Sequence, residues 1–219
     1  MIAALIVVAS ALAAEPSVEV WAGHAIVSGK RSVPILGKVE AKTESWVLAR
    51  VTRKKDGFEL EQRSCEVRLS NPLGVKLALN AGAAELLPPL FIEYVRKPDG
   101  RYYQAPSTTG WDKEDVDRDK SPGMTVNIDA SICDGKLFVG IKTKSMSRGV
   151  LKNDSVLRGE IKAQIAQHVL GHEGACIGLL ADDANEAAVG SFAYVPTSTS
   201  ATCASLAIDR WPIRASAPR

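Results

Sequence analysis

Three aspartates in the most polar stretch of the chain, residues 105–124, have a spacing that can bind a metal ion. They are Asp115, Asp117 and Asp119. Hard oxygen ligands at alternate positions can wrap a Ca²⁺ ion. The stretch departs from an EF-hand, because Lys120 replaces the glycine of the sharp turn and Val126 replaces the closing glutamate. The alternative is a solvated loop whose own lysines and arginine offset the acidic charge.

Two histidines, His168 and His172, form a second candidate metal site. On a helix they share one face and can share an ion. On a strand they are roughly 13 Å apart along the chain, too far for one ion. No glutamate follows His168, so the metalloprotease pattern H-E-x-x-H is absent. The metal interpretation therefore requires a helix over residues 154–172.

Nucleophilic catalysis finds little support. The only imidazole bases are His24, His168 and His172, and there is no G-x-S-x-G elbow. The neighbouring carboxylates of Asp182 and Asp183 diverge, as adjacent side chains usually do. A hydrolase is therefore the least favoured class.

The chain has four cysteines, Cys65, Cys133, Cys176 and Cys203. An even count in an exported chain predicts two disulfides, and none of the spacings fits a zinc site. Three connectivities can be drawn. Sequential pairing, Cys65–Cys133 and Cys176–Cys203, needs no crossing of the chain and is the prediction here. Four free buried thiols are the alternative.

The N-terminus resembles a secretory signal. An apolar run from Ile2 to Leu12 ends in the small-x-small triplet Ala11-Leu12-Ala13. We therefore predict a signal peptide over residues 1–13 and a single β-rich domain over 14–219, secreted or periplasmic. The run is too short to span a bilayer, and the mature chain contains no transmembrane segment. A buried N-terminal strand or helix is the alternative.

The amino-acid composition limits the classes of binding partner to be expected. Hydrophobic residues make up 46% of the 219 residues, which indicates a folded domain, and the formal net charge is only +2. So even a balance gives no reason to expect a nucleic-acid partner.

Period-two alternation is the main structural signal. From Gly37 to Val51, small and apolar residues at odd positions alternate with Lys38, Glu40, Lys42 and other residues at even positions. Val18–Ile26 alternates in the same way. Such patterns indicate strands with one wet face.

Three Asp-Gly pairs predict hairpins, at Asp56-Gly57, Asp99-Gly100 and Asp134-Gly135. The apolar phase slips between Phe58 and Leu69, which predicts a β-bulge near Gln62–Ser64.

Other segments are less regular. Residues 80–90 predict one or two helical turns stopped by Pro88-Pro89. Residues 154–172 fit either helix or strand, and the surrounding strands favour strand. Residues 191–195 and 203–208 have strand-like patterns.

The predicted fold is all-β or β-dominated, an antiparallel barrel or sandwich with one or two short helices. Small residues on an inner face leave room for a ligand inside a closed barrel, or pack closely on another layer. The predicted ligand cavity is lined by Trp21, Val39, Ala41, Trp46, Phe58 and Tyr94. An outer-membrane barrel is rejected, because neither face of the 37–51 strand suits lipid.

These observations favour an exported, non-enzymatic binding protein that holds a small apolar or lipid-like ligand in a β-barrel cavity. The alternative is a structural or protein–protein interaction module of the cell envelope or exterior. No cofactor is expected other than calcium at the three aspartates.

Overall fold

The computed structural model describes residues 18–33, 37–70, 75–130, 133–179 and 181–216. The predicted signal peptide, residues 1–13, lies outside this part of the chain. None of the helices in the described ranges is long and apolar enough to cross a membrane.

The described chain is dominated by strands, all paired antiparallel within one sheet. The strands are β1 (Val18–Val33), β2 (Gly37–Lys54), β3 (Gly57–Ser70), β4 (Lys76–Leu79), β5 (Leu90–Arg96), β6 (Tyr102–Gln104), β7 (Ser107–Trp111), β8 (Met124–Asp129), β9 (Gly135–Lys152), β10 (Val156–Glu173) and β11 (Ala184–Thr197). Short helical segments are α1 (Ala83–Leu86), η1 (Ile177–Leu179) and η2 (Ile208–Arg210). The prediction of a β-dominated fold is confirmed.

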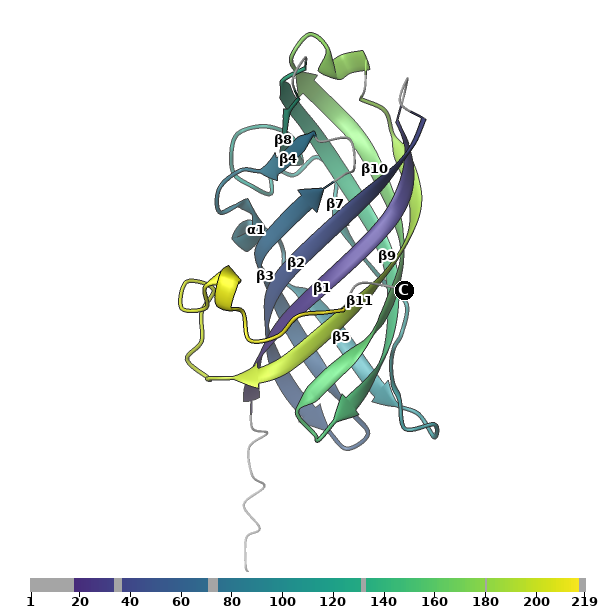
Figure 1. Ribbon diagram of the computed structural model, residues 1–219, viewed down its shortest axis with the longest axis vertical. Coiled ribbons are helices and arrows are strands. Elements are labelled where there is room, and N and C mark those ends of the chain that lie inside the picture. Colours follow the sequence, from purple (N-terminus) through teal and green to yellow (C-terminus); the bar gives the residue numbers. More distant parts are fainter. Residues whose placement is uncertain (1–17, 34–36, 71–74, 131–132, 180, 217–219) are drawn as a thin grey trace, which may run out of the picture.

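The sheet closes into a barrel. Pairing runs from β9 through β10, β11, β1 and β2 to β3, and then returns to β9 by two routes. One route passes through β4 and β8, and the other through β5 and β6. We call the end with β4 and β8 the upper half and the end with β5 and β6 the lower half (Figure 1).

The wall is split between these two routes. β3 pairs with β5 as far as Gln62 and with β4 only at Leu69. β7 pairs with β9 but belongs to neither route, and α1 packs beside β3. Between Gln62 and Leu69, β3 therefore has no partner on this side among the strands that the structure describes, and we call this break in the pairing the opening in the wall.

Alternation assigns the two faces of the long strands. In β2, Val47, Ala49 and Val51 are buried in the interior, while Lys38 and Glu40 are exposed on the outer face. The predicted period-two strand over 37–51 is confirmed, because its small and apolar set faces inward.

Aromatic rings fill the lower half of the interior, and glycines make room for them. A Cβ placed on Gly23 would lie 2.3 Å from the Tyr194 ring. A Cβ on Gly159 would lie 2.7 Å from the Phe192 ring. Large side chains on one strand thus occupy space left by missing side chains on the next, as small barrels require.

Turn and bulge predictions agree with the structure. Each of the three Asp-Gly pairs lies at a hairpin, between β2 and β3, β5 and β6, and β8 and β9. The β2–β3 register shifts at Cys65, because Trp46 faces Glu66 whereas Val47 faces Ser64. Cys65 is the extra residue, directly after the predicted position. Residues 154–172 lie in strand β10, and a helical turn occurs within residues 80–90.

The segment 203–208 is not the strand that we predicted. It consists of turns that lead into η2, and its apolar residues pack against the outside of the barrel. Trp211 and Ile213 cover Ala22 and Trp46 there. In Figure 1 the C-terminal segment, in yellow, runs across the outside of the barrel wall.

All four cysteines form disulfides, but the predicted pairing is wrong. The bonds are Cys65–Cys203 and Cys133–Cys176. The C-terminal segment folds back along the outer wall and brings Cys203 to the bulge in β3. Cys133 precedes β9 and Cys176 follows β10, and these two strands form one hairpin that pairs Lys136 with Glu173, so the hairpin itself places the two cysteines together at the upper end.

Candidate functional site

Three of the predicted cavity residues fill the lower interior. Trp21, Phe58 and Tyr94 are each at most 2% exposed. The ring centroids are 5.9 Å apart for Trp21–Phe58 and 5.2 Å apart for Phe58–Tyr94. Aromatic pairs at this spacing stabilise a core beyond their buried area. The structure brings these residues together as packing partners.

A polar chain runs through this packed region. The Tyr94 hydroxyl lies 2.6 Å from Ser147 Oγ, and Ser147 Oγ donates to Gln104 Oε1 at 2.7 Å. Burial raises the pKa of the Tyr94 phenol. These hydrogen bonds satisfy the polar groups of Tyr94, Ser147 and Gln104, which would otherwise be costly to bury.

The other three predicted cavity residues lie elsewhere. Val39 and Ala41 are on the inner face of β2, at its upper end. Trp46 is on the outer face, in a cluster with Ala22 and Trp211. The six residues therefore do not line one shared cavity.

The upper interior contains charge that the sequence patterns did not reveal. Arg31 Nη2 donates to Gln167 Oε1 at 2.8 Å, and Arg31 Nε lies 3.7 Å from Glu186 Oε2. The Glu186 side chain is 8% exposed. Arg31 Nε and Glu186 Oε2 are buried without a hydrogen-bond partner. This half of the interior is thus polar where the lower half is aromatic.

A pocket of about 640 Å³ lies at the split in the wall. Its apolar lining includes Val67 and Leu69 of β3 and Leu77 and Leu79 of β4, all half-buried. The paired positions Leu69 and Leu77 lie on the inner face. The charged residues of the lining are Glu66, Arg68, Lys76 and Glu85. The opening thus makes inward-facing aliphatic side chains reachable from solvent.

The rim of this pocket is held in place by further contacts. The Arg68 guanidinium lies 4.8 Å from the centroid of the Trp46 ring and donates to Glu66 at 3.2 Å. Lys76 pairs with Asp129 at 3.1 Å. The signals in the sequence for this site were the phase slip in β3 and the broken alternation at residues 80–90.

The predicted metal residues do come together. Asp115, Asp117 and Asp119 each offer a carboxylate oxygen, and these oxygens lie within 4.8 Å of one another. Arg118 and Lys120, with φ of 59° and 73°, turn the chain between and after them. The Asp115 carboxylate accepts the backbone N–H groups of Asp119 and Lys120 at 3.1 and 2.9 Å.

Neighbouring strands hold the aspartate cluster. Asn80 Nδ2 donates to Asp117 at 3.2 Å and to Asp119 at 2.9 Å. The backbone N–H of Thr125 donates to Asp117, and its hydroxyl donates to Asp119 at 2.6 Å. Burial raises the pKa of Asp117, and the nearby charges of Asp119 and Asp115 add to the effect. Burial also acts on Asp119, but hydrogen bonds lower the pKa of its carboxyl overall.

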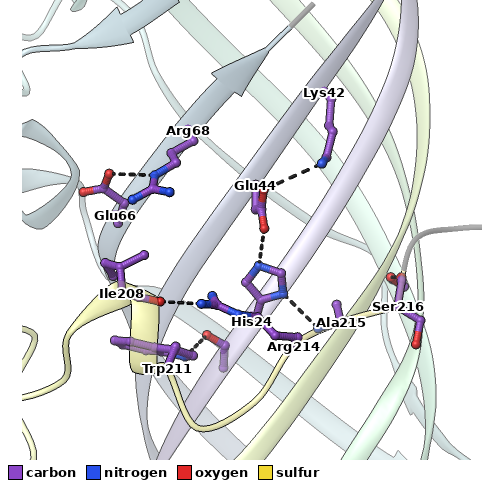
Figure 2. Close-up of polar contacts among 12 residues, drawn as sticks. His24, Lys42, Glu44, Glu66, Arg68, Ile208, Trp211, Arg214, Ala215 and Ser216 are labelled. Atoms are coloured by element: carbon purple, nitrogen blue, oxygen red, sulfur yellow. Dashed lines mark hydrogen bonds and ion pairs between the residues drawn. The ribbon is translucent and has the colours of Figure 1, made fainter.

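His24 is a buried histidine under the C-terminal segment (Figure 2). Its Nδ1 accepts the backbone N–H of Ala215 at 2.8 Å, so its Nε2 carries the proton and donates to Glu44 at 2.8 Å. Burial lowers the pKa of His24, although Glu44 opposes the shift. The sequence placed this residue on a strand face without indicating that the far end of the chain would cover it.

The histidine pair at 168 and 172 forms no shared site. Both residues lie in strand β10, with a register shift between Val169 and Gly171. His168 Nδ1 lies 3.0 Å from Asp183 Oδ2, at the surface. The helix that a shared ion required is therefore absent from this segment.

Comparison with known proteins identifies no relative. No family model and no curated protein matches the chain. One solved structure, "Enduracididine Biosynthesis Enzyme MppR with HEPES Buffer Bound", is similar at 8% identity over 84% of this chain and 87% of that one, with a TM-score of 0.19. So low a TM-score carries no argument about fold or function.

Proposed function

We propose that this chain is an exported, non-enzymatic binding protein whose side pocket holds a small molecule with an apolar body and a polar end. The observation that carries the proposal is the opening in the barrel wall, where leucines of the inner face line a pocket of about 640 Å³. Sites for small molecules commonly have this size and an apolar lining with a few polar groups.

The lining defines the class of ligand. Val67, Leu69, Leu77 and Leu79 offer an aliphatic wall, and covering such a wall contributes about 25 cal/mol for each Å² removed from water. Arg68 and Lys76 are the basic residues of the same lining. A fatty acid fits this chemistry, because its alkyl chain can cover the leucines while its carboxylate meets a rim cation.

The types of residue in the lining favour binding over hydrolysis. Among the described residues of the lining there is no histidine, and the cysteine there, Cys65, is held in a disulfide. General acid–base and thiolate chemistry therefore lack their usual groups there. The two disulfides fit a protein of an oxidising compartment, in accord with the signal peptide expected over residues 1–13.

A dansyl-labelled fatty acid tests the proposal. We expect its fluorescence to rise and saturate on titration with the oxidised, mature protein, and unlabelled fatty acid to displace it. Leu77→Trp places an indole in the pocket and should weaken binding at least tenfold. Leu69→Trp tests the same wall from β3, in case the first variant does not fold.

The matched control is Val189→Trp, since Val189 is 54% exposed on β11, away from the pocket. It should bind the probe like the parent protein, with circular dichroism confirming the fold of each variant. Non-saturable fluorescence, or equal affinity in folded Leu77→Trp and Val189→Trp proteins, would exclude the pocket as the site.

A further inference from the structure

One oxygen of the aspartate cluster is buried and lacks a partner. Asp117 is 7% exposed. Its Oδ2 accepts hydrogen bonds from Asn80 and Thr125, whereas its Oδ1 has none. An ionised oxygen removed from water without compensation is costly, so a further electropositive group beside it would stabilise this arrangement.

No side chain in the described part of the chain supplies that charge. The same loop contains Lys113, Arg118 and Lys120, yet no ion pair within 4.0 Å joins any of them to the three aspartates. The groups that do donate are neutral, namely Asn80, Thr125 and backbone N–H groups of the loop itself. Three carboxylates thus lie together with neutral hydrogen-bond donors around them but without a cationic side chain to offset their charge.

We propose that Asp115, Asp117 and Asp119 bind a Ca²⁺ ion. Carboxylate oxygens are the ligands that hard cations prefer. Asp115 is exposed, so one side of the site is open for solvent to complete the shell. This inference is independent of what occupies the side pocket.

The ligand set favours calcium over magnesium. Ca²⁺ accepts six to eight oxygens in flexible geometry, whereas Mg²⁺ demands a near-ideal octahedron and gives up its waters reluctantly. The three carboxylate oxygens come from one irregular loop and lie within 4.8 Å of one another, and Asp115 is exposed, so a flexible shell completed by water suits them better.

Binding would fasten the loop to two strands. Asn80 directly follows β4, and Thr125 lies in β8. Asn80 also lines the side pocket. An ion at the cluster would therefore stabilise the upper route of the barrel wall, next to the pocket edge.

Calorimetric titration of the chelator-treated mature protein with calcium chloride tests the inference. We expect one site with a Kd of about 0.1–1 mM, the range of extracellular calcium modules. Magnesium chloride should bind at least tenfold more weakly. Tb³⁺ gives a second readout, because Trp111 packs in the same cluster as Val116 of the loop and can sensitise its luminescence.

Substitutions locate the site. Asp117→Asn keeps the shape of the side chain but removes its charge, and should weaken calcium binding at least tenfold. Asp115→Asn does the same at an exposed position, and circular dichroism checks the fold of both variants. Asp112→Asn, in the same loop but outside the cluster, should bind like the parent protein.

Thermal unfolding separates a metal site from a purely structural loop. Calcium should raise the melting temperature of the parent protein but not that of Asp117→Asn. Without calcium, Asp117→Asn should melt no lower than the parent, because it relieves repulsion. The inference fails if neither Ca²⁺ nor Tb³⁺ gives a saturable signal at millimolar concentration, or if Asp112→Asn loses binding as Asp115→Asn does.

Discussion

The lower and upper halves of the barrel share the same long strands but have different interiors. Below, Trp21, Phe58 and Tyr94 contact one another and are almost fully buried. Above, the inner face carries Arg31 and Glu186, and the wall is split. The comparison indicates that the lower half is the more tightly packed one and supplies most of the stability, whereas the upper half, where we propose the binding sites, has a more polar interior and a split wall.

Strand β2 shows how one element serves both halves. Its inner face carries Val47, Ala49 and Val51 below, all at most 3% exposed. Above, the same face reaches Thr43, which is exposed. Alternation continues through both halves, while the size and polarity of the inner residues change. Period-two patterning therefore determines which face is inner, but not how dry it is.

Removing a disulfide should have the largest effect, and the two bonds report on different regions. Replacing Cys65 and Cys203 with alanine opens a loop of 138 residues, worth about 5 kcal/mol by chain entropy. Replacing Cys133 and Cys176 opens one of 43 residues, worth about 4 kcal/mol. Urea unfolding of the oxidised proteins measures both losses.

Hydrogen exchange sharpens this first test. Loss of Cys133–Cys176 should expose amides at the upper ends of β9 and β10, whereas loss of Cys65–Cys203 should free the C-terminal segment. If both variants opened the same amides, the two halves would form one cooperative unit.

Core truncation compares the halves directly. Phe58→Ala should cost about 3–5 kcal/mol, because a fully buried ring leaves a cavity. Leu69→Ala should cost about 1 kcal/mol, since Leu69 is half-buried beside the side pocket. Equal shifts in the urea midpoint would contradict the assignment of stability to the lower half.

The internal ion pair tests the polar upper half. Arg31→Ala should cost about 2–3 kcal/mol, less than for a fully buried pair because Arg31 is 26% exposed, and leaves the Glu186 carboxylate without its cation. Replacing both residues with methionine should restore most of the loss. A double variant as unstable as the single one would show that the pair itself is needed for the fold.

His24 should produce the smallest effect, a pH dependence of the C-terminal segment. Burial lowers its pKa, Glu44 on β2 opposes this, and Arg214 of the C-terminal segment and Lys42 on β2 lower it further. The unfolded chain therefore binds the proton more readily than the folded one. The contribution of neutral His24 to stability is present above its ordinary pKa of 6.5 and is lost as the pH falls from there through the lowered pKa of the folded chain. The loss is about 1.4 kcal/mol for each unit by which folding lowers the pKa.

The hydrogen-bond geometry of His24 predicts the same direction for the pH dependence of stability. Protonated Nδ1 would face the backbone N–H of Ala215, so two donors would meet. Urea midpoints from about pH 7.5 to pH 5 should fall more steeply for the parent protein than for His24→Gln. Comparing the two proteins subtracts the pH dependence that carboxylates cause in both. Parallel curves would show that His24 does not titrate between about pH 5 and pH 7.5.

The sequence alone determined most of the local structure. Alternation identified β1 and β2 as strands, and the Asp-Gly pairs located three hairpins. The pattern over residues 154–172 fitted helix or strand, and only the neighbouring strands favoured what became β10. The phase slip located the bulge at Cys65. These features depend on contacts between residues close along the chain or directly across a hairpin, so residue spacing reveals them.

Only the tertiary structure decided the Cys65–Cys203 bond, the cover over His24 and the opening in the wall. Trp211 and Ile213 pack on Ala22 and Trp46, and this long-range contact brings Cys203 to Cys65. The split arises because β3 has two partners, β4 and β5, where the barrel closes. Closure depends on which distant surfaces bury the most apolar area together, and residue spacing along the chain carries no direct record of that choice.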